Sequence, residues 1–181
     1  GIADEIKLNP QNRCYLCKKA VFSRLLARAK ELGFTNLADG TNKDDLGEYR
    51  PGLKAKEELG VLSPLINLRK FEIRELSREL NLATADKPSY ACLLTRLPHE
   101  KEISIDELNL VEAAENLLIK SGYANVRARL DDRKMKLQMP FSSMQSFLND
   151  VKFKSIVKEL VALGVAEVTL DLKGFREDVL V

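Results

Sequence analysis

Apolar residues in the first half of the chain recur with helical and strand spacing in turn. The segment Ala20–Leu32 carries an apolar residue every three or four positions and ends at Gly33, which predicts a helix. Shorter patterns predict a strand at Asn36–Asp39, a helix at Ala55–Leu59, a strand at Val61–Leu65 and a helix at Lys70–Leu80. This alternation of strands and helices indicates an α/β domain in which helices cover a parallel sheet.

The second half has a different order of elements. An irregular to extended stretch at 93–105 leads into a helical pattern at Asp106–Lys120. Alternating residues at Val126–Leu130 and Met135–Met139, with Asp131–Arg133 between them, predict a hairpin, and a helix at 153–163 and a strand at 167–172 follow. A strand, helix, hairpin, helix and strand in this order favour a small α+β sandwich of ferredoxin-like type. We therefore expect two domains, residues 1–93 and 94–181.

Composition and charge argue against nucleic acids and membranes as binding partners. The 181 residues are 45% hydrophobic, and 29 basic side chains nearly balance 27 acidic ones without forming a basic block. Nucleic-acid binding therefore lacks its usual electrostatic signature. Apolar runs stay shorter than the roughly 18 residues that a membrane span needs, and the first residues do not resemble a signal peptide. These features predict a cytoplasmic protein with no membrane partner.

Three cysteines are the main chemical feature. Cys14 and Cys17 form a C-x-x-C pair and Cys92 stands apart, so the odd count argues against a closed disulfide framework. Thiolates ligate iron–sulfur clusters, and three of them would leave one iron open. A structural zinc site needs four ligands, and His99 would have to be the fourth. A redox disulfide between Cys14 and Cys17, or cysteines with only a structural role, are further alternatives.

Charged side chains suggest two more sites. Asp44 and Asp45 lie in the polar segment Gly40–Gly52 and could hold magnesium, and Arg50 could neutralise a phosphate; a solvated turn has the same composition. Arg127 and Arg129 lie on one face of a predicted strand because side chains alternate, which fits either an anion site or a solvated hairpin face.

Seven segments in a fixed order stand out along the chain: Asn9–Lys18, Asp39–Gly52, Ser63–Leu65, Lys70–Arg74, Lys87–Arg96, Val126–Arg129 and Leu170–Arg176. Together they resemble the LarE family of ATP-dependent sulfur transferases, which are relatives of the PP-loop ATPases. Each segment alone is weak, but their order and spacing extend over nearly the whole chain. The resemblance thus implies the remainder of a PP-loop nucleotide-binding domain in residues 1–93 and a sulfurtransferase and oligomerisation domain in residues 94–181.

The resemblance also implies a reaction. LarE-type proteins use ATP and magnesium to adenylate a carboxylate of a nicotinate-derived mononucleotide, and a sulfur nucleophile then attacks the acyl adenylate; the product serves the nickel-pincer nucleotide cofactor. Some members transfer the sulfur of one cysteine, which corresponds to Cys92. Others hold a [4Fe-4S] cluster on three cysteines, which correspond to Cys14, Cys17 and Cys92. The resemblance further implies a homo-oligomer, from dimer to hexamer.

Two further side chains join the site through this resemblance. Arg96 lies four residues after Cys92 and, with Arg127 and Arg129, would bind the anionic substrate. Glu115 is similar in position to a glutamate of the metal or substrate site. Glu112 and Glu115 are neighbours on one helical face, however, and a solvated helix face is the commoner cause of such a pair.

The chain departs from the family pattern at two places. LarE-type proteins carry a Ser-Gly-Gly-x-Asp-Ser loop around the ATP pyrophosphate, whereas the nine glycines here include no adjacent pair. We therefore expect this chain to lack that loop and to be inactive in adenylation alone. The ending Glu177–Val181 also differs from the family pattern. Two other functions stay open: tRNA thiolation by a PP-loop enzyme, and a metal- or cluster-binding module without enzymatic activity.

Overall fold

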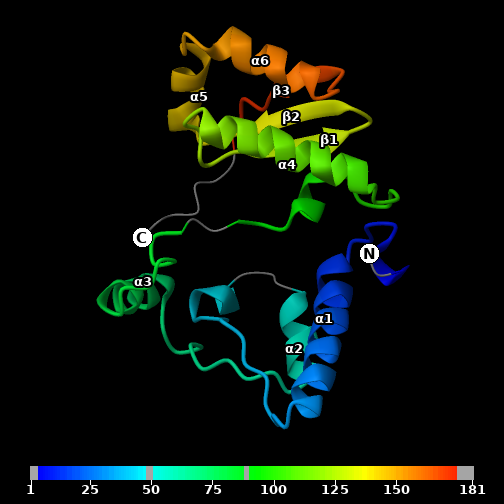
Figure 1. Cartoon of the computed structure of the whole chain (residues 1–181), viewed down its shortest axis with the longest axis vertical. Coiled ribbons are helices and arrows are strands. Elements are labelled where there is room, and N and C mark those ends of the chain that lie inside the picture. The colour runs from blue at the N-terminus through cyan, green and yellow to red at the C-terminus, as the bar shows by residue number, and fades with distance from the viewer. Residues whose placement is uncertain (1–3, 48–50, 88–89, 175–181) are drawn as a thin grey trace. The chain divides into compact units, whose positions relative to one another are not determined.

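A computed structural model describes residues 4–47, 51–87 and 90–174. The chain divides into two compact units, residues 1–90 and residues 91–180, so the division falls three residues before the expected boundary at 93. Figure 1 traces both units from the blue N-terminal helices to the orange C-terminal ones.

The first unit consists mainly of helices. They are the 3-10 turns η1 (Asp4–Ile6) and η2 (Asp44–Gly47) and the α-helices α1 (Arg13–Glu31), α2 (Gly52–Glu58) and α3 (Lys70–Glu79). Helix α1 begins seven residues before the helix expected at Ala20, and it packs side by side with α2 (Figure 1). Gly52, at the start of α2, lies against the Lys18 side chain of α1, and a Cβ atom there would lie 2.5 Å from Cδ of Lys18 and displace that flexible side chain.

A single parallel bridge joins Ala38 and Leu62 in the first unit. The Leu62 amide donates to the Leu37 carbonyl, and the Asp39 amide donates to the Leu62 carbonyl, both at 2.8 Å. The two strands expected at 36–39 and 61–65 thus pair in parallel at this one position. A mixed α/β class is confirmed by the two units together, and the assignment to a PP-loop domain stays a prediction.

The second unit contains a three-stranded sheet and three α-helices. Its elements are η3 (Leu93–Arg96), α4 (Ile105–Lys120), β1 (Arg127–Asp131), β2 (Lys134–Gln138), α5 (Phe141–Leu148), α6 (Phe153–Ala162) and β3 (Glu167–Leu170). Strand β2 lies in the centre, antiparallel to β1 and parallel to β3. The β1–β2 turn consists of Asp132 and Arg133, whose φ angles of 47° and 63° are those of a type I′ turn.

Two elements of this unit differ from the expectation. Helix α5 follows Pro140, and no helix was expected between the hairpin and residue 153. The stretch at 93–105, expected to supply the first strand of a ferredoxin-like sandwich, contains the 3-10 turn η3 instead. Among the residues that the structure describes, the sheet therefore has three strands, and the ferredoxin-like arrangement stays a prediction.

The sheet has one buried and one open face. Alternate residues along β1 and β2 are buried together with the apolar stripes of α4 and α6, and Figure 1 shows both helices against the sheet. The buried residues are Ala128, Leu130, Met135 and Leu137 of the sheet, Val111, Ala114 and Leu118 of α4, and Ile156 and Leu160 of α6. The intervening strand residues, which include Arg127, Arg129 and Gln138, form the open face.

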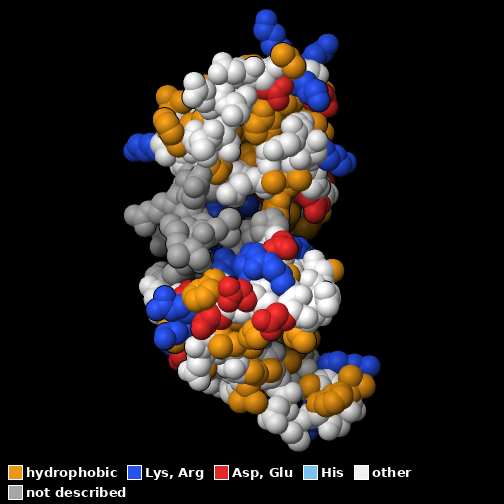
Figure 2. Space-filling model, turned by 90° about the vertical axis from the view of Figure 1, so that its left-hand side faces the viewer, with side chains coloured by type: hydrophobic (Ala, Val, Ile, Leu, Met, Phe, Trp, Pro, Cys, Tyr) orange, Lys and Arg blue, Asp and Glu red, His pale blue; other side chains and the backbone are white. Residues whose placement is uncertain are grey.

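The first unit buries fewer large apolar side chains than the second. Hydrophobic side chains of the first unit are exposed at its surface, and Figure 2 draws side chains of this kind in orange. Phe34 and Leu80 are 66% and 70% exposed. Of the helices among the described residues, none is long and apolar enough to cross a membrane.

Candidate functional site

Cys92 lies at the start of a tight turn in the second unit. It is the residue immediately before η3, and its thiol is exposed and outside any disulfide. Its carbonyl oxygen accepts two hydrogen bonds from Thr95, one from the backbone amide at 2.9 Å and one from the hydroxyl at 2.7 Å. The backbone of Cys92 is thus held in place while its sulfur remains accessible.

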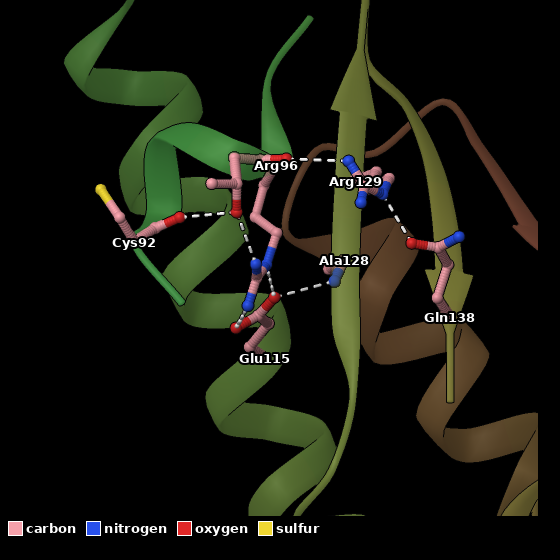
Figure 3. A network of polar contacts seen from close by, with 7 residues as sticks. Cys92, Arg96, Glu115, Ala128, Arg129 and Gln138 are labelled. Carbon is pink, nitrogen blue, oxygen red and sulfur yellow. Dashed lines mark hydrogen bonds and ion pairs between the residues drawn. The ribbon is translucent and has the colours of Figure 1, made fainter. Parts of the chain in front are cut away.

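A buried ion pair lies directly behind this turn. Nε of Arg96 donates to Oε1 of Glu115 at 2.6 Å, and the two side chains are only 2% and 4% exposed. Nη1 of Arg96 also donates to the Thr95 hydroxyl at 2.8 Å, and the Ala128 amide of β1 donates to Oε1 of Glu115 at 2.9 Å (Figure 3). One carboxylate therefore connects α4, η3 and β1.

Arg129, on the open face of the sheet, is hydrogen-bonded to the same turn. Its Nη1 donates to the Thr95 carbonyl at 2.8 Å, and its Nε donates to Oε1 of Gln138 at 2.5 Å (Figure 3). The Gln138 amide donates to Asp171 at 2.8 Å. This hydrogen bond, followed by one from the Lys173 amide, lowers the pKa of the Asp171 carboxyl, so Asp171 is ionised at neutral pH.

The structure separates the four residues expected to bind substrate into two groups. Arg127 and Arg129 lie on the open face and are partly exposed, as the strand alternation predicts. Arg96 and Glu115 are buried and paired with each other. The alternative of a solvated helix face is wrong for Glu115, although Glu112 does lie on the exposed side of α4. Binding of substrate by any of the four stays a prediction.

Cys14 and Cys17 lie in the first turns of α1, in the first unit. Residues three apart on a helix are neighbours on its surface. Cys14 is exposed, Cys17 is partly exposed, and neither forms a disulfide. The neighbouring Tyr15 donates its hydroxyl to Glu58 of α2 at 2.7 Å, which ties this part of α1 to α2. Among the residues that the structure describes, no three cysteine, histidine or acidic side chains come together as metal ligands, so a cluster on Cys14, Cys17 and Cys92 stays a prediction.

Asp44 and Asp45 belong to a hydrogen-bonded loop in the first unit. The Asp45 carboxylate accepts a hydrogen bond from the backbone amide of Asn42 at 3.0 Å. The side-chain oxygen of Asn42 in turn accepts one from the backbone amide of Asp44, also at 3.0 Å. Asp44 also accepts from the Lys70 amide at 2.7 Å, at the start of α3. Both carboxylates thus shape the turn, and their expected role in binding magnesium stays a prediction. Arg50 lies outside the described residues.

A second polar cluster, which sequence reasoning missed, lies at the carboxyl ends of the bridged segments. Asp39 accepts from the hydroxyls of Ser63 and Thr41 at 2.6 Å each, and Nζ of the buried Lys56 lies 3.7 Å from the same carboxyl group. Lys56 also donates to Ser63. Burial raises the pKa of Asp39, but the two hydroxyls, the Thr41 amide and Lys56 outweigh it and lower the pKa below its ordinary value.

Comparison with known proteins places the chain among relatives of enzymes that make sulfur-containing products. It is 35% identical over 177 residues to the pyridinium-3,5-bisthiocarboxylic acid mononucleotide synthase of Lactiplantibacillus plantarum, which covers 96% of this chain and 63% of that protein. It is also 35% identical over 98 residues to the tRNA-specific 2-thiouridylase of Carboxydothermus hydrogenoformans, over 42% of this chain and 27% of the enzyme. No family model matches the chain.

The family assignment follows from one relative of which this chain covers more than two thirds. The chain is 34% identical over 175 residues to an uncharacterized protein of Methanocaldococcus jannaschii, with 96% of this chain and 68% of that protein covered, and it belongs to the same family. An uncharacterized protein of Synechocystis is 39% identical over 93% of this chain, which spans 63% of that protein. The chain thus spans about two thirds of the length of these relatives.

The similarity in sequence to the Lactiplantibacillus synthase confirms the resemblance to LarE-type proteins. The cluster-binding subtype and the absence of the phosphate loop stay predictions.

Proposed function

We propose that this protein is an ATP-dependent sulfur transferase that converts a carboxylate of a pyridinium-type mononucleotide into a thiocarboxylate. Two observations together support the proposal. The relative named as a synthase of such a bisthiocarboxylic mononucleotide matches 96% of this chain, and Cys92, in the segment Lys87–Arg96 that carries the family resemblance, is exposed on a turn held by a buried network. The product would serve the nickel-pincer nucleotide cofactor.

The proposed reaction has two steps. The substrate carboxylate attacks the α-phosphate of magnesium-bound ATP, pyrophosphate leaves, and an acyl adenylate forms. A sulfur nucleophile then attacks the acyl carbon, and the bond to the AMP oxygen breaks, so AMP leaves with the bonding electrons. Arg127 and Arg129 supply planar donors that suit the phosphate and carboxylates of the substrate. Asp44, Asp45 and Arg50 are the residues proposed for magnesium and nucleotide.

The cysteines of the two units offer two sources of sulfur. In one, the Cys92 thiolate attacks the acyl carbon to form a thioester, and β-elimination then removes the Hα proton and breaks the Cβ–Sγ bond, which releases the thiocarboxylate and leaves dehydroalanine at position 92. In the other, Cys14, Cys17 and Cys92 hold a [4Fe-4S] cluster, which would supply a transferable sulfide when bound. The donor set fits this cluster because all three residues are thiols outside disulfides and two of them are neighbours on α1. Zinc fits less well, because three thiols leave a structural zinc site one ligand short.

The test uses the complete gene product, purified without oxygen and supplied with ATP, magnesium and pyridinium-3,5-biscarboxylic acid mononucleotide. We expect AMP and a thiocarboxylate product in equal amounts by mass spectrometry, and we expect Cys92→Ala to abolish the product. AMP release without sulfur incorporation would contradict the proposal. Light scattering of the same sample tests the expected homo-oligomer.

Two further measurements identify the source of sulfur. Iron and acid-labile sulfide analysis should find about four of each per chain, as a [4Fe-4S] cluster requires, and Cys14→Ser or Cys17→Ser should remove both. If iron is absent and the Cys92 peptide loses its sulfur after one turnover, Cys92 is the sulfur donor and the cluster is refuted.

Transfer of sulfur to tRNA is the second candidate, because part of the chain resembles a tRNA-specific 2-thiouridylase. A parallel reaction that offers transfer RNA in place of the mononucleotide decides between the two. Thiolated nucleoside in the digested RNA, with no thiocarboxylate from the mononucleotide, would favour this candidate. Metal uptake with no ATP-dependent product from either acceptor would instead indicate a binding module.

A further inference from the structure

The turn that presents Cys92 is fixed by side chains that cannot themselves face a ligand. Arg96 and Glu115 are 2% and 4% exposed, and their charged groups lie 2.6 Å apart. A carboxylate or phosphate could reach Arg96 only if the pair separated and left Glu115 as an unpaired buried charge, which costs several kcal/mol. Their burial argues against direct contact with substrate.

Thr95 links this pair to the cysteine. Its hydroxyl accepts from Nη1 of Arg96 at 2.8 Å and donates to the Cys92 carbonyl at 2.7 Å (Figure 3). A hydroxyl has one proton to donate, and Arg96 can only donate, so the direction of both bonds is settled. The buried charge of Arg96 therefore orients the Thr95 hydroxyl, which in turn fixes the carbonyl beside the thiol.

We propose that Thr95, Arg96 and Glu115 are positioning residues for Cys92: they set where its sulfur lies without touching substrate. The inference rests on the proposed sulfur transfer and holds whether Cys92 donates its own sulfur or binds a cluster. It assigns a role to Thr95, and it gives Arg96 and Glu115 a role different from the substrate binding that the resemblance implies.

Arg129 extends the arrangement to the open face of the sheet. It holds the carbonyl of Thr95 at 2.8 Å, so Thr95 is fixed through its hydroxyl from the α4 side and through its carbonyl from β1. The turn is therefore held on one side by the buried pair of Arg96 and Glu115 and on the other by the partly exposed Arg129. A shift of about 1 Å in a reacting group can lower a rate about 100-fold, so loss of one clamp should affect the chemical step strongly.

The kinetic test separates positioning from binding. In the complete enzyme, Thr95→Val removes the hydroxyl while keeping the size of the side chain, and Thr95→Ser restores it. We expect Thr95→Val to lower kcat, or the maximal single-turnover rate if Cys92 is consumed, about 10- to 100-fold. The KM for the mononucleotide should stay within twofold of the wild type, and Thr95→Ser should recover most of the rate. Arg96→Lys should behave like Thr95→Val. A rise in KM with unchanged kcat for Arg96→Lys would identify Arg96 as a substrate contact and overturn the proposal.

A second readout does not depend on activity. Alkylation of Cys92 by iodoacetamide, followed by mass spectrometry of its peptide, should change at least threefold in rate in Thr95→Val and return to the wild-type rate in Thr95→Ser. Thr169→Val is the matched control, because it removes a threonine hydroxyl of the same unit that bonds to Met135. Equal rates in all four proteins would refute positioning. If the wild type forms no thiolated product, the proposed function falls, and the alkylation rates still decide whether Thr95 positions Cys92.

Discussion

The buried pair of Arg96 and Glu115 permits a quantitative prediction about stability. The Glu115 carboxylate accepts three hydrogen bonds, from Nε and Nη2 of Arg96 at 2.6 and 3.4 Å and from the Ala128 amide at 2.9 Å. Removing one partner of a buried pair costs about 3–5 kcal/mol because the other charge is left unpaired. A unit of about 90 residues has a free energy of unfolding of about 5–13 kcal/mol. Glu115→Leu or Arg96→Met should therefore remove a large share of it.

The double variant is expected to recover most of this loss. With both charges gone, the remaining penalty is the unpaired Ala128 amide, about 1–3 kcal/mol. The sum of the single losses, about 6–10 kcal/mol, exceeds this by at least about 3 kcal/mol, which is the predicted coupling. Urea titration followed by hydrogen exchange of α4 amides measures unfolding of this unit alone. Glu112→Leu, on the exposed side of α4, is the control and should change stability by less than about 0.5 kcal/mol. Additive single losses would refute the reasoning.

Three further predictions concern other parts of the two units. Phe147→Ala should destabilise the second unit by about 3–5 kcal/mol in urea unfolding, because this ring is buried and meets the rings of Tyr123 and Phe153 edge to face at 5.1 and 5.2 Å; a loss below about 1 kcal/mol would contradict the packing. Burial and the hydrogen bond to Asp150 raise the pKa of Tyr123 to about 12. Absorbance titration should show ionisation of one tyrosine near that pH, and Tyr123→Phe should lack this step. The stability that Tyr123 contributes is fully present below its ordinary pKa of 10.0 and should be lost as the pH rises toward 12. Asp39 has a lowered pKa, so it stabilises the fold above its ordinary value of 3.8; the advantage of wild type over Asp39→Asn in thermal unfolding should shrink as the pH falls below that value, and an advantage independent of pH would exclude this linkage.

The periodicity of apolar residues predicted most of the helices, but it did not predict the start of α1 or the exact residues of the hairpin turn. The start of α1 was predicted late because Arg13–Lys19 carries charges and cysteines rather than a clear apolar stripe, yet helix α1 includes both cysteines of the C-x-x-C pair. The hairpin was predicted, but its turn is the two residues Asp132 and Arg133 in the left-handed region. Both residues are polar, so composition alone did not distinguish a two-residue turn from a three-residue one.

The candidate site was predictable in its residues more than in their roles. Glu115 lies four residues after Val111 and three before Leu118, so the buried stripe of α4 passes through it; this spacing was a signal for a buried carboxylate. Its partner Arg96 is 19 positions away in sequence, and no local pattern connects them. Thr95 carried no signal, because its importance comes from the tertiary contact with Arg96 and from the carbonyl of Cys92.

The hydrogen bond from the Ala128 amide to Glu115 has a consequence for association between molecules. Strand β1 is an edge of the described sheet, and an edge strand offers unpaired amides to which a strand of another molecule can add. Glu115 occupies the Ala128 amide with a carboxylate from its own α4, so this position is closed to a foreign strand. Loss of Glu115 would therefore leave the Ala128 amide available to a strand of another molecule, at an edge that carries Arg127 and Arg129.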